Sequence, residues 1–203
     1  MPDLRPSKIV AVGRNYLAHA RELGHEVPTE PLLFLKPPSA VVGDGDEVRY
    51  PAASHNVHHE AELAVVIGEV CRDVAPGDAL ARVAGFTCAN DVTARDLQES
   101  DDQWTRAKGF DTFCPLGPVV VAGLDPANLR VIGRVNGEVR QDGSTSDMLF
   151  DVPHLVAYIS SVMTLLPGDV VLTGTPPGVG PVQRGDLMEV EIEGIGVLRN
   201  RIG

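Results

Sequence analysis

The sequence predicts a β-rich α+β fold built from many short elements. The chain has 203 residues, a length that suits a single domain with its own hydrophobic core. Its 21 glycines and 16 prolines are spread along the chain, so turns are frequent and a bundle of long helices is not expected. Apolar residues make up 43% and charged residues 22%, which favours a folded protein over a disordered one.

Short apolar runs bounded by turn residues predict the strands. In the first half of the chain they occupy residues 9–12, 32–35, 40–42, 60–67 and 85–90. In the second half they occupy residues 118–122, 130–135, 138–141, 170–173, 187–192 and 196–201. Asn136-Gly137 separates two of these runs and is a strong signal for the type I′ turn of a β-hairpin. The last two runs are expected to form a closing hairpin.

Four segments are predicted to be helical. They are residues 15–23, with Asn15 as a cap, and residues 78–83, 93–101 and 152–165. The last has the strongest pattern, because Pro153 suits the first turn after a cap at Asp151 and apolar residues then recur at helical spacing. These apolar residues are Leu155, Ile159 and Val162.

The charge balance argues against nucleic acid as a partner. The formal net charge is −11, from 28 acidic and 17 basic residues, and no cluster of lysine and arginine stands out. Because an acidic surface repels anions, a site for an anionic substrate needs a local cation.

The cysteines and the start of the chain predict a cytoplasmic protein. Cys71, Cys88 and Cys114 are odd in number and form no CxxC pair, so we expect reduced thiols. Residues 1–5 lack the pattern of a signal peptide, and no apolar run approaches the roughly 20 residues of a membrane span.

Two glutamates in the predicted strand 60–67 are candidate metal ligands. Glu60 and Glu62 are two residues apart, so in a strand they share a face and lie about 6.6 Å apart. The simpler alternative is the solvated face of an amphipathic strand. However, Ala64 and Val66 continue that face, which predicts a covered interior where two carboxylates need a cation or protons.

Asp91 supplies a third acid at the end of the apolar run 85–89. The alternative for this residue is an Asx-turn or a helix cap before Thr93. Three carboxylates with water form a hard oxygen set, which favours Mg²⁺ or Mn²⁺, with Ca²⁺ as a further candidate.

A site of a different kind, with iron or zinc bound by histidine, is the rival interpretation. His55, His58 and His59 lie close to the glutamates in sequence. His59 is expected on the strand face opposite Glu60, which makes it a poor ligand for the same ion.

His19 and Glu22 form a candidate general base. They are three residues apart on a predicted helix and can be neighbours there, so Glu22 can orient the imidazole and raise its basicity towards water. The alternative is an ordinary surface pair.

Further polar residues follow Asp91. Lys108 lies between Trp104 and Phe110, a partly enclosed setting where an ammonium can stabilise an enolate or a carboxylate. Arg95 and Gln98 are one helical turn apart and can grip a carboxylate together, although exposed side chains are the alternative.

Five sequence blocks in this order resemble the fumarylacetoacetate hydrolase family from about residue 8 to the C-terminus. They are Gly13-Arg14-Asn15-Tyr16 with His19 and Glu22, His59-Glu60-Ala61-Glu62-Leu63, Asn90-Asp91 through Gln98, Ala107-Lys108-Gly109-Phe110-Asp111, and Leu172-Thr173-Gly174-Thr175 through Gly180. The likeness is strongest to the small acylpyruvase and oxaloacetate decarboxylase members and to hydroxyheptadienedioate isomerase-like proteins.

The resemblance implies a fold and a set of roles. It implies a mixed β-sandwich roll in one catalytic domain, residues 1–203, with a strand and lid helix at about 8–30, a core at 31–203, and a homodimer. Glu60, Glu62 and Asp91 would bind Mg²⁺ or Mn²⁺. His19 and Glu22 would activate water and Lys108 would stabilise negative charge. The expected substrate contacts are Arg95, Gln98 and Thr175.

The predicted reaction is hydrolysis of the C–C bond of acylpyruvate-type 2,4-diketo acids to pyruvate and a carboxylic acid. The alternatives on the same scaffold are decarboxylation of oxaloacetate and isomerisation of 2-hydroxyhepta-2,4-diene-1,7-dioate. Two others are an iron oxygenase using His58 or His59 and a protein that binds 2-keto acids without turnover.

Overall fold

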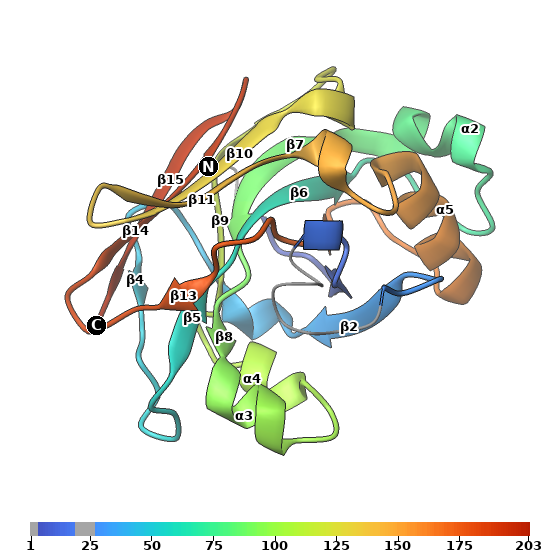
Figure 1. Ribbon diagram of the computed structural model, residues 1–203. Coiled ribbons are helices and arrows are strands. Elements are labelled where there is room, and N and C mark those ends of the chain that lie inside the picture. Colours follow the sequence, from blue (N-terminus) through green and yellow to red (C-terminus); the bar gives the residue numbers. More distant parts are fainter. Residues whose placement is uncertain (1–3, 19–26) are drawn as a thin grey trace.

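The computed structural model describes residues 4–18 and 27–203, which form three β-sheets and several short helices (Figure 1). The largest sheet has the strand order β2 (Leu32–Lys36), β1 (Ile9–Gly13), β12 (Val170–Leu172), β6 (Ala61–Ile67), β7 (Val83–Asn90), β9 (Cys114–Val121) and β3 (Val41–Val42). The second has the order β11 (Glu138–Ser144), β10 (Arg130–Val135), β14 (Leu187–Ile192), β15 (Gly196–Ile202) and β4 (Glu47–Val48). The third contains β13 (Gly180–Pro181), β5 (Val57–His59) and β8 (Thr93–Ala94).

The helices are short and lie at the ends of the sheets. The described α-helices are α2 (Pro76–Ala79), α3 (Arg95–Ser100), α4 (Thr105–Lys108) and α5 (Val152–Val162). Single 3-10 turns occur at η1 (Pro38–Ala40), η2 (Leu80–Arg82), η3 (Pro126–Asn128) and η4 (Thr145–Asp147). Within the described ranges, we find no helix with the length and apolar character that crossing a membrane requires.

The two larger sheets are mixed and the third is antiparallel, and the largest one curls around the centre of the molecule (Figure 1). Parallel pairing joins β1 to β12, β3 to β9 and β4 to β15, and the remaining neighbours are antiparallel. The predicted β-rich mixed fold is therefore confirmed.

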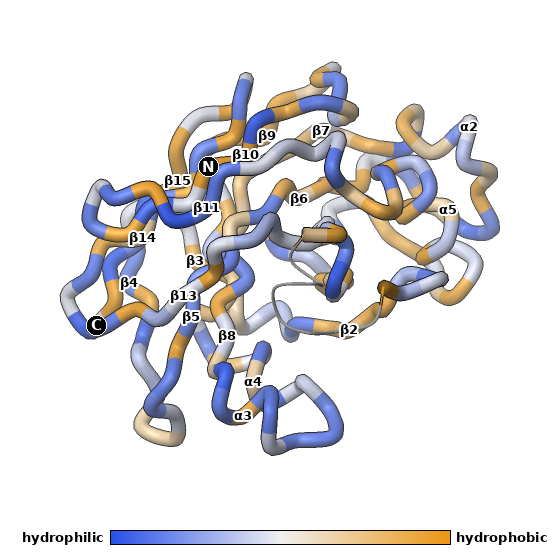
Figure 2. Tube along the Cα trace, viewed as in Figure 1, coloured by the Kyte–Doolittle hydropathy of each residue, from blue (hydrophilic) through white to orange (hydrophobic). Residues whose placement is uncertain are grey.

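The main hydrophobic core lies between the two larger sheets and under α5. Leu63 of β6, Val190 of β14 and Leu155 of α5 belong to one buried cluster. Hydrophobic residues are concentrated along β6 and β7 (Figure 2). All seven residues of β6 are buried, so this strand is covered on both faces. Any polar side chain on β6 is therefore withdrawn from water.

Helix α5 begins as predicted and ends earlier than predicted. The Asp151 carboxylate accepts a hydrogen bond from the backbone N–H of His154 at 2.9 Å, which caps the helix. The helix ends at Val162 rather than at residue 165, because the backbone becomes extended at Met163. Leu165 instead exchanges two backbone hydrogen bonds with Cys71, each of 2.9 Å.

Two strand predictions were wrong at their boundaries. The predicted strand 60–67 is β6, which begins one residue later, at Ala61, because Glu60 separates it from β5. The predicted strand 118–122 is β9 and begins four residues earlier, at Cys114. Leu116 and Gly117 pair with β7, and an irregular register then accommodates Pro118, which has no N–H to donate.

The predicted helix at 93–101 is shorter than expected. Thr93 and Ala94 form β8, which pairs with β5, and the helix begins at Arg95. The helical segment 78–83 is α2 followed by a 3-10 turn, and both precede β7. Of the helix predicted at 15–23, Leu17 and Ala18 are helical, and residues 19–23 lie outside the described residues.

The remaining strand predictions agree with the structure to within two residues at each end, except that β11 ends at Ser144, three residues later than predicted. The hairpin of β10 and β11 turns at Asn136 and Gly137, whose φ angles are 53° and 80°, as a type I′ turn requires. Asn136 also accepts a hydrogen bond from the backbone of Leu187 at 2.9 Å, which ties the turn to β14.

We expect Leu155→Ala to lower the free energy of unfolding by about 2–5 kcal/mol, because it leaves a cavity in the main core. At about 2–4 °C per kcal/mol, the loss is visible in a thermal unfolding curve. Val162→Ala is the matched control, since Val162 lies on the same helix and is 58% exposed. Equal losses in the two variants would contradict this packing of α5.

Candidate functional site

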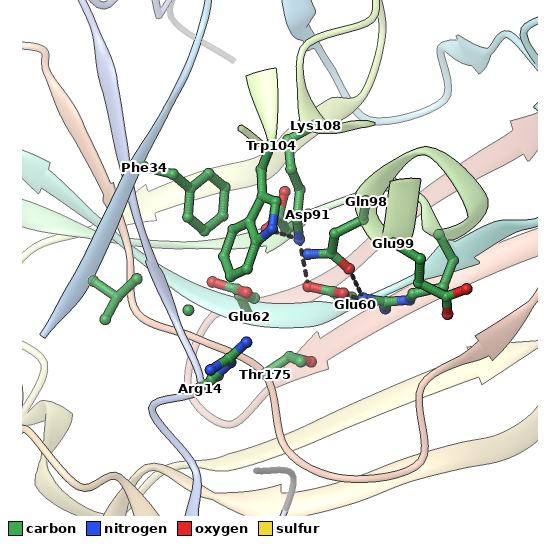
Figure 3. Close-up of a pocket in the computed structure, with 13 residues that line it drawn as sticks. Arg14, Phe34, Glu60, Glu62, Asp91, Gln98, Glu99, Trp104, Lys108 and Thr175 are labelled. Carbon is green, nitrogen blue, oxygen red and sulfur yellow. Dashed lines mark hydrogen bonds and ion pairs between the residues drawn. The ribbon is translucent and has the colours of Figure 1, made fainter. Parts of the chain in front are cut away.

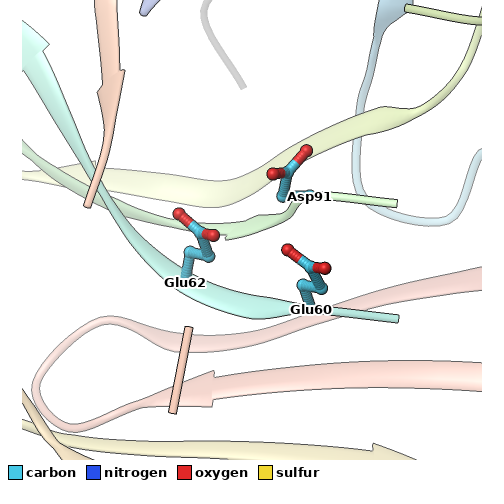
Figure 4. A group of neighbouring side chains, drawn as sticks. All are labelled: Glu60, Glu62 and Asp91. Carbon is cyan, nitrogen blue, oxygen red and sulfur yellow. The ribbon is translucent and has the colours of Figure 1, made fainter. Parts of the chain in front are cut away.

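Three acidic side chains converge where β6 and β7 lie side by side. Glu62 projects from β6, Glu60 precedes that strand, and Asp91 follows β7. One carboxylate oxygen from each lies within 4.8 Å of the others (Figure 4). Their exposed fractions are 5% for Glu60, 2% for Glu62 and 1% for Asp91. The structure therefore brings together the three residues that the sequence selected.

Backbone geometry holds the two strand ends together at this point. Ala61 lies opposite Asn90 in the antiparallel register. The N–H of Glu60 donates to the side-chain oxygen of Asn90 at 2.9 Å, and the N–H of Asp91 donates to the carbonyl of Glu60 at 2.9 Å. These bonds replace regular strand pairing where β5 passes into β6, so the break at Glu60 is stabilised.

Three basic side chains contact the acids. Lys108 donates to Glu60 at 2.9 Å and to Asp91 at 2.6 Å, and Arg95 donates to Glu60 at 2.5 Å. Lys36, which is only 1% exposed, donates to the other oxygen of Asp91 and to the carbonyl of Val92. Buried charges of one sign are thus matched by buried charges of the other.

The electrostatics of the site favour a bound cation. Burial raises the pKa of Glu62 well above its ordinary value, and the neighbouring Asp91 and Glu60 raise it further. Burial lowers the pKa of Lys108, but Asp91 and Glu60 outweigh this, so its pKa is raised and the ammonium stays charged. A divalent cation would relieve the repulsion at Glu62, and the all-oxygen set fits Mg²⁺ or Mn²⁺.

The glycine-rich loop that follows β12 contacts the carboxylate of Glu62. Gly174 has a φ of 96° and donates its N–H to the Glu62 carboxylate at 2.8 Å. A side chain at position 174 would also be strained, since a Cβ there would lie 2.8 Å from the Cβ of Asn15. This loop therefore fixes the orientation of Glu62.

Thr175 follows in the same loop, and its hydroxyl both donates and accepts a hydrogen bond within the protein. It donates to the carbonyl of Ala61 at 2.8 Å and accepts from the amide of Gln141 at 2.7 Å. In this arrangement its hydroxyl hydrogen is already used, although the side chain lines the pocket.

The acids open into a pocket of about 410 Å³ (Figure 3). It is lined by Val12, Gly13, Arg14, Phe34, Glu60, Glu62, Asp91, Arg95, Gln98, Glu99, Trp104, Lys108 and Thr175. The predicted residues Arg95, Gln98, Lys108 and Thr175 are thus all at the pocket. Arg95 also donates to the amide oxygen of Gln98, which confirms that these two side chains are neighbours.

The aromatic surroundings of Lys108 differ from the prediction. Trp104 lines the pocket as expected, but Phe110 packs edge to face on Phe113, in a separate core cluster. Phe34 of β2 takes its place, with its ring centre 5.0 Å from the Lys108 ammonium and 5.3 Å from the centre of Trp104. These two rings cover one side of the acids.

The described histidines have other partners. His59 Nδ1 is hydrogen-bonded to the Gln141 side chain at 3.1 Å, and His58 Nε2 to that of Asn56 at 3.0 Å. Burial lowers the pKa of both imidazoles to about 4. In residues 4–18 and 27–203, the acidic triad is the one group of three side chains of metal-binding type that lie close enough to share an ion. His19 and Glu22 lie outside the described residues.

Two basic residues of the site were missed in the sequence. Lys36 ends an apolar strand directly before Pro37, and a charged side chain at such a position is a sign of a buried ion pair. Arg14 follows β1 and lines the pocket, and its φ of 59° could not be inferred from composition.

Comparison with a family model places these observations in context. The model of the fumarylacetoacetate (FAA) hydrolase C-terminal family matches residues 8–203. The mitochondrial oxaloacetate tautomerase FAHD2A of Homo sapiens is 49% identical over 213 residues, which cover 99% of this chain and 68% of that protein.

Two solved structures with named activities are similar to this chain. The 2-hydroxyhepta-2,4-diene-1,7-dioate isomerase from Mycobacterium marinum has a TM-score of 0.91 and 51% identity, covering 98% of this chain and 75% of that one. The fumarylpyruvate hydrolase from Pseudomonas aeruginosa, in complex with Mn²⁺ and pyruvate, has a TM-score of 0.91 and 37% identity, covering 96% of this chain and 88% of that one.

We expect Glu62→Gln to stabilise the metal-free protein above the ordinary pKa of glutamate, because a neutral amide neither repels Glu60 and Asp91 nor has to take up a proton on folding. The melting temperature in EDTA should rise by about 2–4 °C per kcal/mol of relieved repulsion. Mg²⁺ or Mn²⁺ should stabilise the wild type but not the variant. Glu99→Gln, an acid of the pocket wall outside the triad, is the control and should keep the metal response.

The role of Glu62 can also be tested by varying the pH. The pKa of Glu62 is raised in the folded metal-free protein. Above the ordinary pKa of glutamate, the folded protein therefore still holds a proton that the unfolded chain has released. The free energy of unfolding in EDTA should therefore fall as the pH rises from the ordinary pKa of glutamate through the raised pKa of Glu62. Over the same pH range, the affinity for the metal should increase. A metal response in Glu62→Gln equal to that of the wild type would contradict the role of this residue.

Proposed function

This chain belongs to the fumarylacetoacetate hydrolase family, and we propose that it is a divalent-metal-dependent enzyme that interconverts the keto and enol forms of a small 2-keto acid. The observation that carries this proposal is the buried triad of carboxylates with the Lys108 ammonium bonded to two of them. Such a site concentrates positive charge where a substrate oxygen becomes negative once a metal is bound.

The roles of the residues follow from their contacts. Glu60, Glu62 and Asp91 would hold Mg²⁺ or Mn²⁺, which would polarise the keto oxygen of the substrate. Asp91 and Glu60 raise the pKa of Lys108 in the metal-free site. Its ammonium would stabilise negative charge on that oxygen while the proton at the adjacent carbon exchanges with solvent. Charge stabilisation of this kind accelerates both directions of the interconversion.

Arg95 is suited to bind the substrate carboxylate. Two of its nitrogens are held by Glu60 and Gln98, which fixes the plane of the guanidinium. Its Nε is buried and has no hydrogen-bond partner in the described part of the chain, so one donor remains for a ligand. Gln98 and Thr175 complete this side of the proposed substrate site.

Relatives about half identical to this chain support proton transfer as the first choice. One is named an oxaloacetate tautomerase and another a 2-hydroxyhepta-2,4-diene-1,7-dioate isomerase. Both names describe movement of a proton and a double bond without cleavage of the carbon chain.

Lys108→Met tests this proposal. We expect kcat for enol-to-keto conversion of oxaloacetate with Mg²⁺, followed by ultraviolet absorbance, to fall about 100- to 1000-fold, the cost of removing one preorganised donor. Arg106→Met is the control, since Arg106 lies on the same helix and its side chain is 57% exposed. Equal rates for wild type and Lys108→Met would refute the assignment.

Hydrolysis of 2,4-diketo acids is the second candidate, because the sequence contains the His19–Glu22 pair and a fumarylpyruvate hydrolase is 37% identical. If it operates, acetylpyruvate and Mg²⁺ yield pyruvate and acetate. His19→Ala should then slow pyruvate release about 100- to 10 000-fold and affect keto–enol exchange much less. Release of pyruvate at the same rate in both proteins would exclude His19 from water activation.

Two further readouts belong to these assays. Release of CO₂ from oxaloacetate in a Lys108-dependent manner would identify decarboxylation on the same site. Sedimentation of the purified chain tests the homodimer implied by the family resemblance.

A further inference from the structure

Arg14 enters the pocket from a constrained turn. The residue has a φ of 59°, a conformation that is strained for a residue other than glycine. Gly13 before it leaves no room for a side chain, because a Cβ there would lie 2.9 Å from the ring of Trp104. Asn15 after it is fully buried and hydrogen-bonded to Phe150 and Thr173. The direction of the Arg14 side chain is therefore set by packed neighbours on both sides.

The Arg14 side chain has no carboxylate partner in the described part of the chain. Its guanidinium carbon lies 5.9 Å from the centre of the Trp104 ring, at the distance of a cation–π contact. Its Nε is buried and makes no hydrogen bond to the described residues. A buried donor without a partner is costly, so this nitrogen is a candidate to bind a ligand atom.

Arg14 differs in this respect from the other bases of the site. Lys36, Lys108 and Arg95 each contact a carboxylate of the triad. In Figure 3, Arg14 lies on the side of Glu62 and Thr175, whereas Gln98 and Glu99 lie beyond Glu60 on the other side. Among the described residues, the pocket thus presents one guanidinium with a carboxylate partner, that of Arg95, and one without, that of Arg14, from different sides.

The formal charge of the site favours a dianion. Among the described residues, four acids and four bases line the pocket or contact its acids, namely Glu60, Glu62, Asp91, Glu99, Arg14, Lys36, Arg95 and Lys108. A divalent cation therefore leaves two positive charges when all acids are ionised. A ligand with two carboxylates neutralises both, and a ligand with one carboxylate leaves one uncompensated.

We propose that Arg14 binds a second carboxylate of the substrate, remote from the 2-keto acid group, so that the site selects dicarboxylic over monocarboxylic 2-keto acids of equal length. The planar fork of arginine suits a carboxylate, and its stacking on Trp104 limits the orientations available to it. This inference rests on the proposed 2-keto acid site and names the class of substrate.

Binding of ligands that are matched in chain length provides the test. With Mg²⁺ present, calorimetry compares 2-oxoglutarate with 2-oxopentanoate, which have the same chain length and differ in the second carboxylate. Oxaloacetate and 2-oxobutanoate form a shorter pair. For at least one pair, we expect wild type to bind the dicarboxylate about 10- to 100-fold more tightly, the factor for a hydrogen bond between charged groups.

Arg14→Met should abolish this preference by weakening only the dicarboxylate, and Arg14→Lys should restore part of it. Arg184→Met is the matched control, because Arg184 also stacks on an aromatic ring, 5.3 Å from the centre of Tyr50, and does not line the pocket. Melting temperature and Mg²⁺ affinity show whether each variant is folded.

The outcomes separate the inference from its premise. The inference is overturned if wild type binds both members of each pair equally, or if Arg14→Met weakens the binding of both members equally. In either case Arg14 does not bind the second carboxylate, while the proposed 2-keto acid site stands. If wild type binds none of the four acids with Mg²⁺, the proposed function falls and the inference falls with it.

Discussion

The pocket of this protein is organised around three carboxylates that repel one another and are withdrawn from water. Glu60, Glu62 and Asp91 place oxygens within 4.8 Å of one another in a nearly dry setting. Charges in such a position persist only with close positive partners. Lys36, Lys108, Arg95 and the N–H of Gly174 supply part of that compensation, and a divalent ion would supply the rest.

The sheet topology makes this compensation possible. The acids come from the ends of two paired central strands, β6 and β7, while Lys36 ends the edge strand β2 and Lys108 ends α4. None of these contacts is local in sequence, since Lys36 and Asp91 are 55 residues apart and Lys108 and Glu60 are 48 apart. The site is thus a product of the complete fold rather than of one loop.

The sequence predicted the acids well because their signal is local. Glu60 and Glu62 lie two residues apart beside an apolar face, and Asp91 ends an apolar run, so local patterns marked all three as candidates. The resemblance to the fumarylacetoacetate hydrolase family is what joined them in one metal site. Lys36 gave a weaker signal, since its importance comes from a partner distant in the chain. The end of α5 was misplaced because Leu165 continues the apolar pattern of the helix. In the structure, the backbone of Leu165 instead forms hydrogen bonds with the backbone of Cys71. Arg14 could not be assigned, because its positive φ and its contact with Trp104, which is distant in the chain, leave no local signal in the sequence.

The hydrogen bond from Gly174 to Glu62 gives the protein an internal reporter. A glycine amide proton resonates in a sparsely populated region of a nitrogen–proton correlation spectrum, and its chemical shift responds to the charge of the oxygen that it contacts. Deprotonation of Glu62 and arrival of a metal would therefore be recorded separately at one backbone nucleus, without any added label in the pocket. The occupancy of the centre could then be followed in solution, one titration step at a time.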